Sequence, residues 1–377
     1  MGDCHLGGWR QSELKKLNFQ CFQEALTRSL NQKVDFILIS GDLFDSPYPP
    51  IETLKETFEE FRKLKEKDIP VFIIAGSHDY SVSGKTFLDV LEKAGFCKNV
   101  FIHEIKDGKI ILNPTICKGA AIYGYPGRKS GLEVEEIEKV KLQDAPGLFK
   151  ILMLHTAIRD AVGNAQIKSV DETTLPKVDY LALSHLHINY YKGNIVYSGP
   201  TFPNNISELE ELQGGSFFIF DNGKIKKEVL KTKEIISVTL EINDALTATE
   251  RILQFFEGKN IKDKIIIIRV IGHLEKGKIS DINFQKIESF LKEKEALVVL
   301  KSTSKLHISQ LEVQTDFSDS ENLEAQIINK FREANPNKFN AIIGSLINSL
   351  KIEKNEDETV SSFEERLLSE NRKIIEI

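Results

Sequence analysis

The sequence is poor in cysteine, and its few cysteines are widely scattered. Cys4, Cys21, Cys97 and Cys117 form no Cys-x-x-Cys pair in the 377 residues. This spacing argues against a disulfide framework and a cysteine-based zinc site, and it fits a reducing cytoplasm. The sequence also lacks any run of 18 apolar residues and any basic, apolar leader after Met1. It therefore predicts neither a membrane span nor a secretion signal, and we expect a cytoplasmic protein.

An excess of positive charge is also lacking. The chain has 50 Lys and Arg residues against 56 Asp and Glu residues, a formal net charge of −6. Because nucleic-acid-binding domains are often basic, this balance counts mildly against a nucleic-acid partner. Bound metal ions would offset part of the negative charge at the site that holds them.

Strand-like apolar runs alternate with helical patterns in the first half of the chain. The runs cover residues 34–39, 71–74, 120–123, 150–154 and 180–183. Helical spacing of apolar residues is expected over residues 12–30, 54–64 and 84–94. This alternation predicts an α/β sheet with helices on its faces.

The pattern changes to strands alone from about residue 194. Asp221-Asn222-Gly223 is a favourable hairpin turn, so we expect residues 224–230 to return antiparallel to the preceding run. A β-α-β-α-β pattern follows over residues 237–301, and polar sequence with helical apolar spacing near 339–350 and 363–377 ends the chain. The expected domains are 1–232 (α/β), 233–313 (small α/β) and 314–377 (charged linker and helices).

Two acidic motifs open the search for a functional site. In Asp3-Cys4-His5, residues two apart point to the same side of an extended loop, so a carboxylate and an imidazole can hold one ion. A polar N-terminal loop without function is the alternative. Asp42 follows a buried run, where a carboxylate is costly unless it is paired or bound to metal. The alternative there is a strand-to-helix turn in which Asp45 or Ser46 caps the next helix.

Histidines follow three further strand-like runs. Gly76-Ser77-His78-Asp79 sets a histidine beside an acid, so His78 is a candidate general acid whose environment Asp79 fixes or tunes. His155 closes the run at 151–154, and taken alone it is better explained as structural. In Ser184-His185-Leu186-His187 both histidines share a face, an arrangement common in metal sites. Ligands of open α/β sheets gather at this edge, the carboxyl ends of the strands.

The joint order of these motifs resembles the calcineurin-like metallophosphoesterases, which implies a β-sandwich flanked by helices. Within that superfamily the chain resembles the Mre-eleven/SbcD double-strand-break nucleases, in domain order as well, and an archaeal source is expected. The residues that carry this resemblance are His5-Leu6-Gly7, Gly41-Asp42-Leu43-Phe44-Asp45, Gly76-Ser77-His78-Asp79 with Ser83-Gly84-Lys85, and the stretch from Ser184 to Pro200. It is specific over about 205 residues and looser afterwards.

The resemblance implies two manganese ions and a role for each site residue. One ion would be held by Asp3, His5, Asp42 and His187, and the other by Asp42, His155 and His185. His78 would protonate the departing 3′ oxygen. Ser77, Asp79 and Asp45 would bind a metal or stand just behind the ligands.

The chain departs from the family pattern in two places. Ser77 stands where the family has an asparagine whose carbonyl binds the second ion, so we expect weaker occupancy of that ion's site. Only Met1 and Gly2 precede Asp3, where the family has a buried strand of about five residues. A version extended upstream is therefore expected to be more stable.

The implied function is metal-dependent DNA cleavage in double-strand-break repair, as a 3′–5′ exonuclease on duplexes and an endonuclease on single strands. The alternatives are a small-molecule or cyclic-nucleotide phosphodiesterase, or a scaffold with an impaired metal site.

The resemblance also implies partners, namely DNA, a Rad-fifty/SbcC-type coiled-coil ATPase and a second copy of the chain. The helix at 339–350 and apolar tail residues would dock the ATPase: Phe363, Leu367, Leu368, Ile374 and Ile375. Dimer contacts, or alternatively core contacts, would come from Phe58, Phe61, Phe87, Leu88 and Leu91. Candidate DNA contacts are Arg10, Lys15, Lys16, Arg128 and Lys129.

Overall fold

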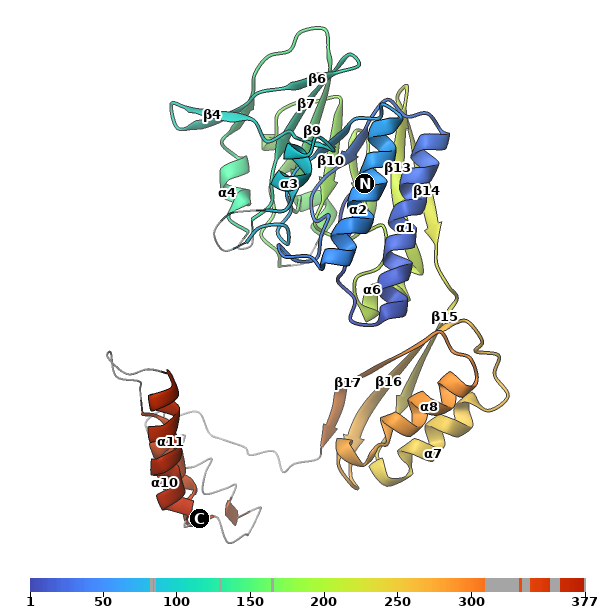
Figure 1. The fold of residues 1–377 in the computed structure, drawn as a ribbon, viewed down its shortest axis with the longest axis vertical. Helices are drawn as coiled ribbons and strands as arrows, with labels where there is room; N and C mark the ends of the chain where they lie inside the picture. Colours follow the sequence, from blue (N-terminus) through green and yellow to red (C-terminus); the bar gives the residue numbers. More distant parts are fainter. Residues whose placement is uncertain are drawn as a thin grey trace. The chain divides into compact units, whose positions relative to one another are not determined.

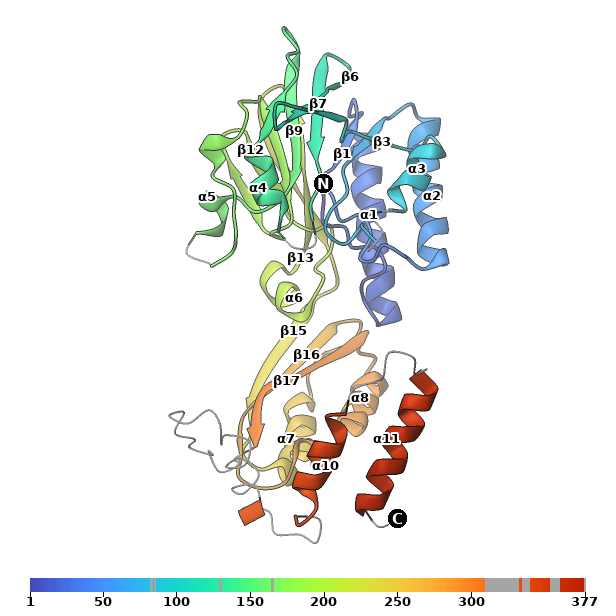
Figure 2. The same ribbon diagram turned by 90° about the vertical axis from the view of Figure 1, so that its left-hand side faces the viewer.

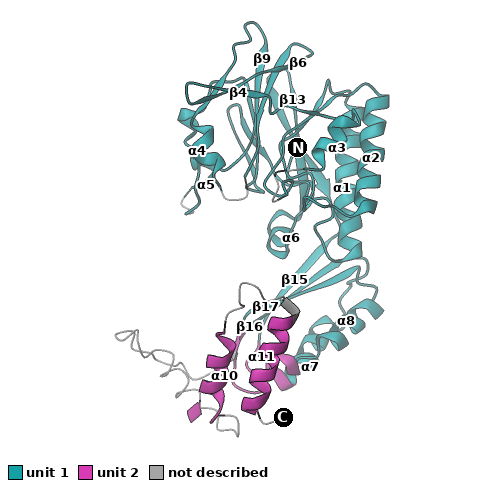
Figure 3. Ribbon diagram, turned by 60° about the vertical axis from the view of Figure 1, so that its left-hand side comes forward, with its two compact units in different colours: residues 1–241, 247–271, 282–305 teal, residues 242–246, 272–281, 306–377 magenta. Residues whose placement is uncertain are grey.

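The chain forms two compact units in the computed structural model (Figure 3), which describes residues 1–81, 84, 86–128, 131–163, 166–308, 332–333, 340–352 and 360–375. One unit contains residues 1–241, 247–271 and 282–305. The other contains residues 242–246, 272–281 and 306–377. The domain boundaries expected at residues 232 and 313 remain a prediction.

A short parallel sheet packs against three helices in the first unit (Figure 1). Its strands are β1 (Ile37–Ile39), β2 (Val71–Ile73) and β3 (Lys98–Asn99), in that order. The helices are α1 (Ser12–Asn31), α2 (Ile51–Glu66) and α3 (Leu88–Lys93). Their apolar faces are buried together with those of β1 and β2 in one cluster.

The first six residues run beside β1 and connect it to the second sheet. Ser40 donates its backbone N–H to the Met1 carbonyl (3.0 Å), and Asp3 donates to the Gly41 carbonyl (3.1 Å). On the other side, Gly2 forms a parallel bridge with Pro200. These backbone contacts fix the segment that carries Asp3 and His5.

A six-stranded sheet forms the other layer of the sandwich. Its order is β11-β12-β10-β9-β7-β6, and its four central strands are parallel. The bounds are β6 (Thr115–Cys117), β7 (Ala120–Tyr125), β9 (Phe149–His155), β10 (Tyr180–Ser184), β11 (Asn189–Lys192) and β12 (Ile195–Ser198). Phe72 and Ile74 of the first layer are buried against Ile151 and Met153 of this one. The fold is therefore a β-sandwich.

Smaller elements cover the outer side of the six-stranded sheet (Figure 2). They are α4 (Glu133–Ile137), α5 (Arg159–Val162), the 3₁₀ turn at Glu172–Thr174, and a three-stranded sheet of β4 (His103–Lys106), β5 (Lys109–Leu112) and β8 (Val140–Leu142). Large side chains such as Tyr123, Tyr125 and Tyr197 fill the core between them.

A helix, a hairpin and a further sheet follow in the sequence and contribute to the packing around α1. The helix is α6 (Ile206–Leu212), and the hairpin pairs β13 (Gly214–Asp221) with β14 (Lys224–Lys231). The further sheet has the order β15 (Ile235–Glu241), β16 (Ile265–Leu274), β17 (Val298–Ile308), with α7 (Ala245–Phe256), α8 (Phe284–Glu293) and a 3₁₀ turn at Ile279–Asp281. Ile265 and Leu300 of this sheet are buried in one cluster with Leu14 of α1 and Leu209 of α6.

Two helices are described in the tail, α10 (Ile343–Leu350) and α11 (Val360–Ile375). Ser349 of α10 donates its hydroxyl to the Asn371 side chain of α11 (2.6 Å). Among the described helices, none combines the length and apolar character needed to cross a membrane.

Most expected elements are confirmed, and two expectations need correction. The stretch after residue 194 is not all strand, because α6 interrupts it. The helix expected over 84–94 is shorter. Of the two roles left open for the apolar residues of α2 and α3, the core alternative is confirmed: Phe61, Leu88 and Leu91 are at most 1% exposed, and Phe58 and Phe87 pack against them. Ser83, Lys85, Lys129 and Phe339 lie outside the described residues.

Candidate metal centre

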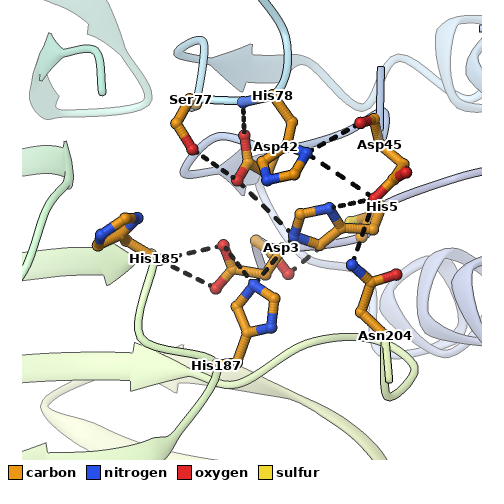
Figure 4. A network of polar contacts seen from close by, with 12 residues as sticks. Asp3, His5, Asp42, Asp45, Ser77, His78, His185, His187 and Asn204 are labelled. Carbon is orange, nitrogen blue, oxygen red and sulfur yellow. Dashed lines mark hydrogen bonds and ion pairs between the residues drawn. The ribbon is translucent and has the colours of Figure 1, made fainter. Parts of the chain in front are cut away.

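The motifs found in the sequence meet at one edge of the two layers (Figure 4). Asp3 and His5 lie beside the end of β1, and the backbone N–H of His5 donates to the Asp42 carbonyl (3.0 Å). Asp42 follows β1 and His78 follows β2, while His155 ends β9. His185 and His187 come directly after β10. Five strand ends or neighbouring segments therefore supply the site.

Asp3, His5 and His187 form a first group that could hold a metal ion, the first ligand group. The Nε2 atoms of His5 and His187 lie 2.9 Å apart, and the His187 Nε2 lies 3.9 Å from an Asp3 oxygen. Each Nδ1 faces a carboxylate, Asp45 for His5 (3.1 Å) and Glu208 for His187 (2.9 Å). When Nδ1–H donates to a carboxylate, the Nε2 lone pair is left free. Two such lone pairs at this distance repel each other unless a proton or a cation lies between them.

Asp3, Asp42 and His155 form a second ligand group, and all three are buried. The His155 Nδ1 faces the Ser40 carbonyl (3.1 Å), which leaves Nε2 directed at the Asp42 carboxylate (3.2 Å). This Nε2 atom is buried without a hydrogen bond. A buried polar atom without a partner is costly, so a proton or a cation between this nitrogen and the Asp42 carboxylate would be stabilised there.

The electrostatics of the site favour a positive charge at its centre. Burial opposes the imidazolium form of His155, but the Asp42 charge outweighs it and raises the pKa of His155 to about 9. Burial likewise opposes ionisation of Asp42, but His155 and His5 hold the pKa of Asp42 well below its ordinary value. For His187, burial is outweighed by Glu208 and Asp3, and its pKa rises to about 9. Protons thus occupy positions that a cation can take.

His185 meets the site through its backbone. Its N–H donates to both oxygens of Asp3 (3.0 and 3.1 Å), and its ring lies on the far side of that backbone from Asp3 (Figure 4). The ring is in edge contact with the His155 ring, 5.1 Å between centroids. Burial and then the nearby charge of His155 lower the pKa of His185 to about 4, so the ring is neutral at pH 7. Its role as a ligand remains a prediction.

Five of the expected ligands have left-handed backbone conformations that residues other than glycine rarely adopt. The φ angles are 49° for Asp3, 43° for His5, 50° for Asp42, 103° for His185 and 52° for His187. Such conformations cost about 1–3 kcal/mol each and cluster at functional sites. The strain is independent support for a working site here.

Two glycines permit the close approach of the ligand-bearing loops. Gly41 has φ +100°, and a Cβ atom there would lie 2.5 Å from the His155 Nδ1. A Cβ atom on Gly76 would lie 2.2 Å from an Asp42 carboxylate oxygen. Both positions therefore require glycine.

The His78 loop lies directly beside the ligands. The backbone N–H of His78 donates to Asp42 (2.8 Å), and the Ser77 hydroxyl lies 3.5 Å from the other Asp42 oxygen. The His78 ring packs edge-on against His5, and its Nδ1 faces the Asp45 carbonyl (2.9 Å). The side chain is 47% exposed, against 1% for His5 and 19% for His187. His78 is thus more open to a substrate than these two neighbours.

Asp79 contacts backbone groups near the site. Its carboxylate accepts the backbone N–H groups of Gly76 (2.9 Å) and Phe44 (3.1 Å). Burial, reinforced by the charge of Asp42, raises the pKa of Asp79 to about 7. Asp79 therefore holds the two ligand-bearing loops together.

Sequence reasoning did not include Glu208 and Asn204. Glu208 contacts His187, and Asn204 donates its side-chain N–H to Asp45 (3.2 Å). Asn205-Ile206-Ser207-Glu208 matches the pattern of a helix start in which an acid follows the cap by three residues. That pattern was the available signal, because it predicts a helix close to His187.

The residues present fit divalent metal ions. Carboxylate oxygens converge with the Nε2 atoms of His5, His187 and His155. The Nδ1 atom of each ring faces a hydrogen-bond partner, as expected of metal-ligating histidines. Mixed oxygen and imidazole donors suit manganese, iron or zinc.

Comparison with known families agrees with this geometry. The model of the calcineurin-like phosphoesterases matches residues 1–189, which include every expected ligand. The chain belongs to the calcineurin-like phosphoesterases. As a member of this family it is a metal-dependent phosphoesterase, and the β-sandwich flanked by helices expected from the sequence is confirmed.

Several similar proteins come from archaea, consistent with the expected source, and one comes from the bacterium Bacillus subtilis. Three of the archaeal proteins that share the name "DNA double-strand break repair protein Mre11" illustrate the similarity. The Methanosarcina acetivorans protein is 27% identical over 92% of this chain and 56% of its own length. The Methanococcus maripaludis protein is 29% identical over 59% of this chain and 62% of its own length. The Methanocaldococcus jannaschii protein is 28% identical over 76% of this chain and 75% of its own length. This chain thus spans less than two thirds of the first two relatives.

Proposed function

We propose that this chain is a manganese-dependent DNA nuclease that processes DNA ends in double-strand-break repair. Its activities would be 3′–5′ exonuclease cleavage of duplexes and endonuclease cleavage of single strands. The observation that supports DNA as substrate is the extent of similarity: the alignment with a DNA-repair relative takes in 92% of this chain, well beyond the phosphoesterase match at 1–189. A small-ester hydrolase would need to share only that catalytic part.

Two ions are proposed, with ligands divided as the sequence predicts. Asp3, His5, Asp42 and His187 would hold the first. Asp42, His155 and His185 would hold the second, with the Ser77 hydroxyl a weaker neighbour than an asparagine carbonyl. Such ions polarise phosphoryl oxygens, activate water and neutralise charge that develops on the phosphate.

His78 is proposed as the catalytic acid. Its Nδ1 faces the Asp45 carbonyl (2.9 Å), so Nδ1–H donates there and Nε2 remains for the substrate. The exposure of the ring supports this role, because the leaving 3′ oxygen must reach it. The backbone bond from His78 to Asp42 fixes the acid relative to the ligands.

DNA, a Rad-fifty/SbcC-type ATPase and a second copy of the chain are proposed as partners. Arg10, Lys15, Lys16 and Arg128 are exposed and available to phosphates, although Arg128 also pairs with Glu136 (3.4 Å). The exposed Leu350 and Leu368 of α10 and α11 support a docking role for the tail. Buried core residues of α2 and α3 are not part of the proposed dimer surface.

One experiment tests the substrate. Wild-type protein and His78→Ala are incubated with Mn²⁺ and either linear duplex DNA or bis-p-nitrophenyl phosphate. DNA cleavage that the substitution abolishes supports the nuclease. Cleavage of the small ester alone would support a small-molecule phosphodiesterase, and inactivity on both substrates would support a scaffold with an impaired site.

A further inference from the structure

Helix α6 separates two sets of polar contacts that use neighbouring acidic residues. Glu208 and Glu210 are two positions apart, so on a helix with 3.6 residues per turn they point to nearly opposite sides. Glu208 points to the metal centre, and Glu210 meets the β15–β16–β17 sheet. Leu209, between them, is fully buried. The helix is therefore held from both sides and from its core face.

The Glu208 side closes a ring of contacts around the first ligand group. One Glu208 oxygen accepts from the His187 Nδ1 (2.9 Å), and the other accepts the backbone N–H of Asn204 (2.7 Å). The Asn204 side chain donates to Asp45 (3.2 Å), and that same Asp45 oxygen contacts the His5 Nδ1 (3.1 Å). The start of α6 thus fixes both imidazoles whose Nε2 atoms converge (Figure 4).

The Glu210 side is held by a cation from β16. The Arg269 guanidinium donates from Nε to both Glu210 oxygens (2.9 Å each) and from Nη2 to the Ser207 hydroxyl (3.2 Å). Ser237 of β15 donates its hydroxyl to the same carboxylate. Both charged side chains are only about a quarter exposed, 24% for Arg269 and 23% for Glu210. Forked, charge-assisted contacts of this kind fix orientation as well as distance.

We propose that α6 couples the β15–β16–β17 sheet to metal binding: Arg269, through Glu210, sets the position of α6, and Glu208 and Asn204 pass that position to His187 and His5. Glu208, Asn204 and Arg269 are positioning residues, because they act through the two imidazoles. A displacement of the sheet, as when a long substrate presses on it, would shift the helix and change the affinity of the first ligand group. The inference rests on the proposed function only in taking Mn²⁺ as the ion.

The test measures Mn²⁺ binding to the full chain by calorimetry, without any substrate. Glu208→Ala should weaken binding at the first ligand group by about 10- to 100-fold, as loss of a partner behind a ligand does. Arg269→Gln, remote from the ligands, should weaken it by about three- to tenfold. The matched control is Lys264→Gln, which breaks the Lys264–Glu234 ion pair (2.8 Å) at the starts of β16 and β15 and lies outside α6. Its affinity should stay within about twofold of wild type.

A double variant separates coupling through α6 from general damage to the sheet. If Arg269 acts through Glu208, Arg269→Gln should cause no further loss in the Glu208→Ala background. Glu208→Gln, which preserves the size of the side chain, replaces Glu208→Ala should the latter fail to fold. Imidazole ¹⁵N chemical shifts of His187 in the metal-free protein should also change in Glu208→Ala, since its Nδ1–H partner is lost.

The possible outcomes bear on the two proposals separately. The coupling would be overturned if Arg269→Gln bound Mn²⁺ as tightly as Lys264→Gln does. It would also be overturned if the two losses of Mn²⁺ affinity multiplied in the double variant. Neither result would affect the nuclease proposal. A wild-type chain that binds no Mn²⁺ would overturn both.

Discussion

Replacement of Gly76 by alanine should disable the metal centre by displacing Asp42, and it should also lower stability because the clash includes the Asp42 backbone. The added Cβ would lie 2.2 Å from an Asp42 carboxylate oxygen and 2.4 Å from the Asp42 backbone nitrogen, whereas ordinary contacts begin at 3.4 Å. The carboxylate must therefore move by about 1.2 Å, and a misplacement of about 1 Å can lower a rate by roughly a hundredfold. This corresponds to about 2.7 kcal/mol of lost transition-state stabilisation.

The assay combines phosphodiester cleavage, Mn²⁺ calorimetry and a thermal melt of the metal-free protein. Gly76→Ala should lose about a hundredfold in cleavage rate and should bind Mn²⁺ more weakly, because Asp42 belongs to the second ligand group. The control is Gly344→Ala in α10, where the nearest atom to the new Cβ is a flexible Arg332 nitrogen at 3.8 Å. That variant should keep wild-type cleavage.

The result that would refute the reasoning is specific. If Gly76→Ala melts like the wild type and also retains cleavage and Mn²⁺ affinity within twofold, the position of the Asp42 carboxylate does not determine activity. A variant that unfolds instead would show that the loop cannot absorb the clash.

Three further predictions concern the ions and the tail. Since the pKa values of both His155 and His187 are raised to about 9, Mn²⁺ must displace protons at pH 7, and its affinity should increase as pH rises towards 9. Calorimetry at pH 7 and 8 in buffers of different ionisation enthalpy measures the released protons. A pH-independent affinity would contradict this prediction. Ser77→Asn should strengthen binding of the second ion by about tenfold, because an amide carbonyl is the better ligand; an unchanged titration would show that Ser77 does not limit that site. Leu368→Glu on the exposed face of α11 should prevent co-purification with the coiled-coil ATPase while Mn²⁺-dependent cleavage continues; retained co-purification would remove α11 from the proposed docking surface.

The positions of the proposed ligands were predictable because they follow buried apolar runs. The run at 34–39 and the acid after it specify both β1 and the place of Asp42, and the run at 150–154 does the same for β9 and His155. Parallel neighbours in a sheet bring such positions to one edge, so sequence order alone indicated a shared site.

The supporting contacts were only partly predictable from local patterns. The capping pattern at Asn205–Glu208 predicts the start of α6, although the helix is only seven residues long, too short for apolar periodicity to add to that signal. The partners could not be predicted, because Glu208 and Asn204 act across the fold, 21 residues from His187 and 159 from Asp45 in sequence. The direction of the His185 ring was equally inaccessible, because it depends on a φ of 103° rather than on residue type.

The left-handed backbone at the ligands implies a trade-off between stability and catalysis. Each of Asp3, His5, Asp42 and His187 occupies a conformation that glycine adopts without penalty, so a glycine there would relieve about 1 kcal/mol of strain and remove a ligand. Selection for thermal stability alone would erode these positions, and selection for activity preserves them. Stabilising substitutions for this protein should therefore be sought away from the ligand-bearing loops, where stability can rise without loss of the chemistry.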